Sequence, residues 1–210
     1  MMHAIEVFKA QRLGIDVSEV FRYMGVRTKD ADENMRSLAE EAVRTVSACS
    51  RGAACFLRLP IIQNESGLFI GPVQMDGNSL KRHLHGCTEA YIFAATIGLD
   101  ADRAITASAK LSPARAVALD AAGSAAVENF CDQLCDHLRT MSKENLRSRF
   151  SPGYGDLPLQ AQSQILNLLD VRRMIGLSAT AGGMLIPTKS VTAIVGIGGD
   201  ENENQRSASK

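Results

Sequence analysis

The sequence has no excess of charge of either sign, and this balance limits the kinds of macromolecule that the protein is expected to bind. Lys and Arg together number 23, equal to the 23 Asp and Glu, and no basic run stands out. The positive patch expected of a nucleic-acid binder is therefore missing. No apolar run reaches the roughly 20 residues that span a bilayer, and the N-terminal MMHAIEVFKAQRLG lacks the uninterrupted apolar core of a signal peptide. We expect a cytoplasmic protein with no nucleic-acid or membrane partner.

Several chemical signatures are absent as well. The chain contains no G-x-x-x-x-G-K-[ST] and no G-x-S-x-G, which argues against a nucleotide-phosphate site and a nucleophile elbow. The five cysteines lack the spacing of a disulfide framework, so we expect free, mostly buried thiols in a reducing compartment. A metal site at His83, His85 and Cys87 would need a strand, whereas the local pattern predicts a helix, so we predict no metal site.

The length and the C-terminal composition suggest one domain followed by a tail. A domain of 210 residues can bury a sizeable core, hiding roughly 70% of the surface that its unfolded chain exposes. We expect this domain to cover residues 1–199. The polar stretch at 200–210 has no apolar anchor, which predicts a disordered tail.

The apolar pattern predicts an α+β fold, in which helices flank a twisted antiparallel sheet of a few strands. Helical spacing and capping signals predict helices at 16–25, 30–49, 79–86, 114–141 and 159–175. Alternating or continuous apolar runs predict strands at 51–62, 67–71, 90–98, 177–180 and 190–197. Asp16 or Ser18 is expected to cap the first helix, and Ser79 the third. Met35 is expected to begin the buried stripe of the second helix.

The loop R-F-S-P-G-Y-G-D-L-P at 149–158 is the most constrained stretch of the chain. Its two prolines fix φ, while its two glycines permit backbone angles closed to other residues, so the loop can be held in one shape. Arg149 and Tyr154 would then face whatever the loop encloses. The simpler interpretation is a turn that leads into a helix.

Four short motifs follow one another from this loop to the last strand: R-x-x-x-G-Y, P-L-x-x-Q, I-G-L and M-x-x-P-x-K-S-V-T-A-I. In this order they resemble the activation domain of cobalamin-dependent methionine synthase, and most of all its free-standing forms. The stretch G-C-T-E-A-Y-I-F-A-A-T-I-G-L-D-A-D-R extends the resemblance toward the N-terminus. In that family the R-x-x-x-G-Y loop binds S-adenosylmethionine, so the resemblance implies that Arg149, Gly153 and Tyr154 contact this ligand.

The resemblance adds four further candidate positions. Asp16 can simply cap a helix, but the family has an aspartate in a similar I-D-x-[ST] context that contacts S-adenosylmethionine. Glu128 can be an exposed residue beside an apolar stripe, or it can line a pocket above its small helix neighbours. The family carries a ligand-contacting glutamate on the corresponding helix. Its ligand also touches main chain on the last strand, at positions that match Val195 and Gly196.

The function implied by the resemblance is accessory to a methyltransferase. The protein would bind S-adenosylmethionine, dock on a cobalamin-binding methionine synthase or related corrinoid protein, and support reductive methylation of its cofactor. The electron would come from a flavodoxin-like carrier or another reductant. The D-x-H-x-x-G sequence of many corrinoid proteins is missing, so the partner must bring the cobalamin. Two alternatives stay open: a non-catalytic module that senses S-adenosylmethionine or binds a corrinoid protein, and an α+β protein with an empty or repurposed pocket.

Overall fold

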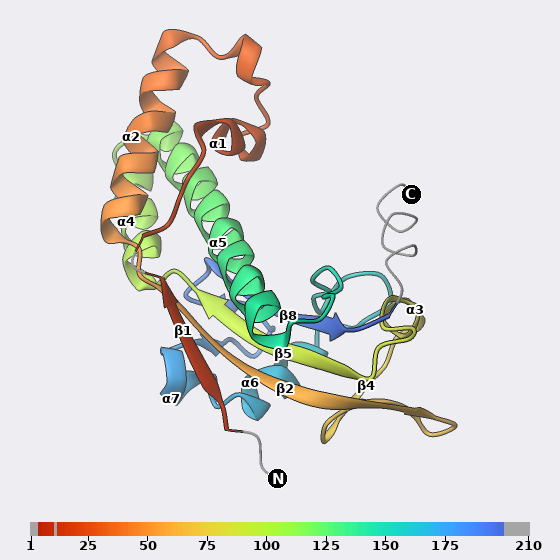
Figure 1. The fold of residues 1–210 in the computed structure, drawn as a ribbon. Coiled ribbons are helices and arrows are strands. Elements are labelled where there is room, and N and C mark those ends of the chain that lie inside the picture. Colours follow the sequence, from red (N-terminus) through yellow and green to blue (C-terminus); the bar gives the residue numbers. More distant parts are fainter. Residues whose placement is uncertain (1–3, 11, 200–210) are drawn as a thin grey trace.

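The computed structural model describes residues 4–10 and 12–199, and Figure 1 shows how their elements are arranged. The strands are β1 (Glu6–Ala10), β2 (Gly52–Asn64), β3 (Gly67–Ile70), β4 (Val73–Met75), β5 (Glu89–Thr96), β6 (Ser178–Ala179), β7 (Leu185–Ile186) and β8 (Ser190–Ile197). The helices are α1 (Val17–Tyr23), the 3₁₀ turn η1 (Thr28–Asp30), α2 (Glu33–Cys49), α3 (Asn78–His83), α4 (Leu99–Ala109), α5 (Pro113–Ser142), α6 (Ala161–Leu168) and α7 (Val171–Ile175). The predicted α+β class is confirmed. The tail predicted at 200–210 lies outside the described residues.

The long strand β2 organises the main sheet, whose order is β4-β3-β2-β5-β8 with β1 added to β2. Its first part pairs with β1 and β5, and its last four residues pair with β3. The strand β8 pairs with β5 over its full length, from Ser190 opposite Thr96 to Ile197 opposite Glu89. All these pairs are antiparallel, as the sequence predicts.

Both faces of the sheet are covered, so its central strands are apolar on both sides. The helix α5 crosses one face (Figure 1). Phe56 and Phe93 pack with Phe130 there in one buried cluster. Leu57 and Ile92 point to the other face, where they join residues of α6 and α7 in a second cluster. Successive strand residues point to opposite faces, and for this reason β5 is a continuous apolar run rather than an alternating one.

The helix α5 matches the prediction of 114–141 within one residue at each end. Ser112 caps its start by accepting a hydrogen bond from the Arg115 N–H at 3.4 Å, and Pro113 supplies a preset φ. Lys143 ends the helix in the left-handed conformation, with φ at 56°. Within the described part of the chain, no helix is both long and apolar enough to cross a bilayer.

The single helix predicted at 159–175 is wrong, because the chain forms two short helices there. Asp170 separates α6 from α7 and has a left-handed backbone with φ at 44°. Leu169 and Val171 are both buried in the same core cluster. Residues two apart on one helix point in different directions, so the break allows both side chains to enter the core.

Other differences concern exposed elements and caps. No sequence pattern predicts β1, whose residues are mostly exposed, or α4. Asp32 caps α2 by accepting from the Met35 N–H at 2.8 Å, so this helix begins after the predicted residue 30. Met35 is 37% exposed and does not begin the buried stripe. Asp16 caps α1, as predicted.

We predict that Phe130→Ala lowers the free energy of unfolding by about 3–5 kcal/mol, because it leaves a cavity between α5 and the sheet. Phe130 is fully buried, stacks on Phe8 and lies so close to Gly52 that a Cβ there would meet its ring at 2.8 Å. Urea denaturation measures the change. Leu111→Ala, at a side chain 87% exposed, is the control and should alter stability by less than about 0.5 kcal/mol. Equal effects of the two variants would contradict this account of the core.

Candidate functional site

The segment that follows α5 extends the sheet at the edge of β8. Leu146 bridges to Ile197, and Phe150 bridges to Ile194 in antiparallel fashion. Phe150 and Ile194 exchange both backbone hydrogen bonds at 2.9 Å, and the Arg147 N–H donates to the Gly196 carbonyl at 2.8 Å. These bonds fix the backbone on both sides of residue 149 before the constrained loop begins.

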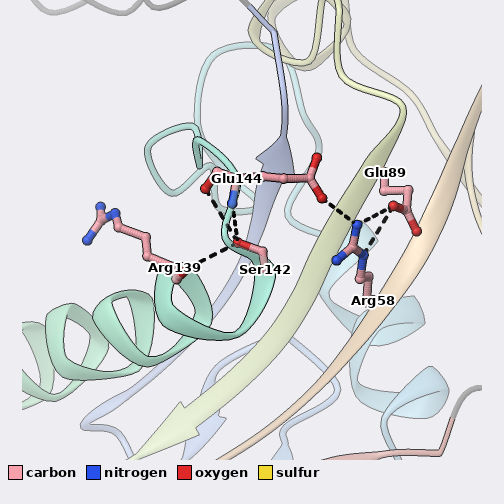
Figure 2. Close-up of polar contacts among 5 residues, drawn as sticks. All are labelled: Arg58, Glu89, Arg139, Ser142 and Glu144. Atoms are coloured by element: carbon pink, nitrogen blue, oxygen red, sulfur yellow. Dashed lines mark hydrogen bonds and ion pairs between the residues drawn. The ribbon is translucent and has the colours of Figure 1, made fainter.

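An ion-pair network holds the exit from α5 in place (Figure 2). The guanidinium of Arg58, on β2, donates to Glu89 on β5 at 3.1 Å and to Glu144 at 2.8 Å. Glu144 in turn donates its backbone N–H to the Ser142 hydroxyl at 3.3 Å, at the last residue of α5. The network therefore ties the end of the helix to two strands of the sheet.

Arg149 forms the centre of a charged cluster against α5. Its Nη2 donates to Glu128 Oε2 at 2.8 Å and makes an ion pair with Asp132 Oδ1 at 3.1 Å. The Arg149 side chain is only 23% exposed, and its Nη1 is buried without a hydrogen-bond partner among the described residues. Burial lowers the pKa of Arg149, but electrostatic interactions with Cys131, Glu128, Asp132 and Cys135 together more than offset this, so the pKa is raised.

The chemistry of this cluster suits a zwitterion. A guanidinium can bind a carboxylate through two parallel hydrogen bonds. The two acidic side chains, one helical turn apart on α5, can accept from an ammonium group. A buried N–H without a partner is costly, so an acceptor that reaches Arg149 Nη1 would be stabilised there. A hydrogen bond thus connects Arg149 and Glu128, two of the ligand-binding residues predicted from the sequence.

The constrained loop is anchored on α3. The Asp156 carboxylate accepts from the backbone N–H groups of Asn78 and Ser79, both at 2.8 Å, and these bonds lower the pKa of Asp156. Asp156 thus caps α3 from a distant part of the chain, while the N-cap position itself is Gly77. The prediction of Ser79 as the cap is wrong, because Ser79 lies within the helix. Gly155, at φ +54°, lies so close to Ser79 that a Cβ would meet its side chain at 2.7 Å.

A second contact between α3 and the chain before the loop involves His83. Its Nε2 lies 2.8 Å from the Ser148 carbonyl, which can only accept, so His83 donates. Burial lowers the pKa of His83, consistent with a neutral ring at pH 7. The ring also packs on Phe150, with centroids 5.1 Å apart. Arg149 therefore lies between two anchored stretches of backbone.

Gly153 and Tyr154 lie in the anchored loop, at its solvent side. Gly153 has φ at +92°, and its N–H donates to the Leu157 carbonyl at 2.9 Å. Tyr154 is 67% exposed, and its ring lies 6.3 Å from that of Phe150. The loop is therefore a closed turn, as its simpler interpretation states, and it carries an exposed aromatic side chain. A ligand contact of either residue stays a prediction.

Asp16 caps α1, with its Oδ1 accepting from the Ser18 N–H at 2.8 Å, a bond that lowers its pKa. The preceding turn is pinned to α5, because the Gly14 N–H donates to Asn129 Oδ1 at 3.1 Å. Asn129 is the next residue along the chain from Glu128. The structure thus attaches the turn before α1 to the α5 residue that follows Glu128, and the bond described for Asp16 goes to its own helix. A ligand contact of Asp16 stays a prediction.

Val195 and Gly196 lie near the C-terminal end of β8, and their backbone groups point to opposite edges of the strand. Gly196 accepts from the Arg147 N–H, so groups of even-numbered residues face the segment after α5. Backbone groups alternate along a strand, so those of Val195 face β5, where it pairs with Tyr91. A Cβ on Gly196 would lie 2.8 Å from Cys87 Sγ, and this close packing requires glycine. Main-chain contact of either residue with a ligand stays a prediction.

Two acidic residues of this region had no signal in the sequence. Asp132 follows Glu128 by one helical turn, so the two share a face of α5. This spacing does not reveal that the Arg149 side chain packs against that face. Asp156 follows Gly155 in the constrained loop, and its partners in α3 are more than 70 residues away along the chain. Both contacts depend on the packing of distant segments.

Another cavity lies away from this cluster. It has a volume of about 360 Å³ and lies between α6, α7 and β6, with Asn167, Asp170, Leu177 and Thr180 in its lining. Arg149 and Glu128 are not part of its lining. No group of three or more His, Cys, Asp or Glu within residues 4–10 and 12–199 could hold a metal ion. This cavity is thus separate from the charged cluster on α5.

Comparison with known proteins gives one informative result. No protein-family model matches the chain, and no curated protein sequence matches it either. Among solved structures, the chain is similar to the crystal structure of the MetH reactivation domain bound to AdoHcy, with a TM-score of 0.72 and 17% sequence identity. The match covers 92% of this chain and 78% of that chain. At this identity the likeness is one of fold: the chain folds like the MetH reactivation domain.

Proposed function

We propose that this protein binds S-adenosylmethionine at the Arg149 cluster and supports reductive methylation of cobalamin carried by a partner methionine synthase or related corrinoid methyltransferase. The observation that carries the proposal is the buried, unpartnered Nη1 of Arg149 beside two carboxylates. The similar fold of a domain that was solved with AdoHcy supports it. The four sequence motifs that run from Arg149 to Ile194 support it independently.

Each residue of the cluster has a physical role in this proposal. Arg149 binds the ligand carboxylate through charge-assisted hydrogen bonds, which recover the unsatisfied N–H. Glu128, 45% exposed and already oriented by Arg149, accepts from the ligand ammonium. Asp16 and Tyr154 supply further polar and aromatic contacts for the remainder of the ligand. Gly153 allows the ligand to approach the backbone of the loop closely.

The contribution of the chain to the reaction is positional. S-adenosylmethionine supplies the methyl group, and a flavodoxin-like carrier or another reductant supplies the electron. Holding donor and acceptor in line removes much of the entropy cost of a bimolecular encounter. The anchored loop and the paired segment at β8 hold Arg149 still, so the protein orients its ligand for a docked partner. The transfer needs no general base from this chain.

We predict that Arg149→Ala weakens S-adenosylmethionine binding by about 30- to 1000-fold, since a charge-assisted bidentate contact contributes about 2–4 kcal/mol. Calorimetric titration measures the affinity. Arg139→Ala is the matched control, because Arg139 lies on α5 and pairs with the exposed Asp136. Unchanged affinity in Arg149→Ala would exclude this arginine from the site.

We predict that Asp156→Ala lowers stability by about 1–2 kcal/mol through loss of the α3 cap and weakens S-adenosylmethionine binding by about three- to ten-fold. The loss of affinity follows because the loop is no longer anchored beside Arg149. Asp32→Ala removes a comparable cap from α2, so it should cost similar stability without loss of affinity. Denaturation and titration of both variants provide the comparison. Equal affinity losses would show that the effect is not specific to the loop.

A reactivation assay on a corrinoid methyltransferase distinguishes this function from that of a non-catalytic sensing module. We predict that an inactive corrinoid methyltransferase regains turnover only when the protein, S-adenosylmethionine and a reductant are all supplied. Omitting each component in turn is the control, and product formation is the readout. A protein that binds S-adenosylmethionine tightly but restores no turnover with any tested corrinoid partner would favour the sensing module.

A further inference from the structure

The two carboxylates that face Arg149 are not equivalent. Glu128 makes both a hydrogen bond and an ion pair with Nη2 at 2.8 Å, and its side chain is 45% exposed. Asp132 makes only an ion pair with the same nitrogen at 3.1 Å, and its side chain is 67% exposed. An exposed ion pair contributes little, about 0–1 kcal/mol. Asp132 is therefore the weaker and more easily displaced partner.

Asp132 also leaves the guanidinium incompletely satisfied. Both acidic side chains meet Nη2, while the buried Nη1 has no hydrogen-bond partner in the described part of the chain. A ligand carboxylate that spans Nη1 and Nη2 would satisfy both nitrogens at once, since the guanidinium and carboxylate geometries match. Such a carboxylate needs a place on Nη2 that Asp132 holds in this structure.

We propose that Asp132 is a displaceable occupant of the Arg149 site, which the ligand carboxylate replaces on binding. The inference rests on the proposed function, because it assumes a ligand with an α-amino acid group. Asp132 positions Arg149 while no ligand is bound. After displacement it stays on the same turn of α5, where its negative charge repels the ligand carboxylate. Its presence therefore lowers affinity for carboxylate-bearing ligands and leaves ligands without a carboxylate unaffected.

The test compares two ligands on three proteins by calorimetric titration. S-adenosylhomocysteine carries the amino acid group, and 5′-methylthioadenosine carries the same thioether nucleoside without it. Asp132→Asn should bind S-adenosylhomocysteine about three- to ten-fold more tightly than the unmodified protein, with no change for 5′-methylthioadenosine. Asp136→Asn is the matched control, because it makes the same charge change one turn further along α5, where Asp136 pairs with Arg139. It should change neither affinity.

Each other outcome overturns the inference in a recognisable way. If the unmodified protein binds S-adenosylhomocysteine and Asp132→Asn binds it equally well, Asp132 forms only a surface ion pair. If Asp132→Asn binds it more weakly, Asp132 contacts the ligand ammonium instead of competing with the carboxylate. If Asp136→Asn tightens binding as much as Asp132→Asn, the effect is general electrostatics. If the unmodified protein binds neither ligand, the proposed function itself fails and the inference fails with it.

Discussion

Backbone pairing between the segment after α5 and the edge of β8 is the constraint on which the candidate site depends. Phe150 and Ile194 exchange two hydrogen bonds, and Phe150 packs toward the cluster that contains α6 and α7. Side chains alternate along an extended segment, so Arg149 points to the other face, where α5 lies. A shift of one residue would reverse this orientation. The register at β8 thus decides which residue meets Glu128.

The charge of Arg149 decides what this geometry can bind. A guanidinium that is mostly buried needs acceptors, because burying a charge without partners is costly. Glu128 and Asp132 supply acceptors for one nitrogen only, and the remaining buried nitrogen stays unsatisfied. The fold maintains this arrangement through contacts elsewhere: the Arg58 network at the end of α5 and the Asp156 cap on α3. The surrounding structure therefore holds the cluster in an arrangement in which Arg149 Nη1 lacks an acceptor among the described residues.

The elements that the sequence predicted well have strong and local signals. For α5, a proline after a capping serine and a long apolar stripe mark both the start and the buried face. For β5 and β8, burial on both faces leaves continuous apolar runs. The strand β1 was missed because its exposed edge position leaves no apolar pattern. The break at Asp170 was missed because helical spacing continues across it, and the core decides between one helix and two.

The sequence by itself determined the α+β class, the long helix, the cap at Asp16 and a rigid loop with Arg149 at its start. These features follow from periodicity, capping chemistry and the fixed φ of proline, all of which act over a few residues. Only the tertiary structure decided that Arg149 meets Glu128 and Asp132, and that Asp156 holds the loop on α3. Those contacts join residues from 17 to 78 positions apart. They exist because α5 packs across the sheet and because β8 fixes the register of the segment beside it, and no short-range pattern encodes either condition.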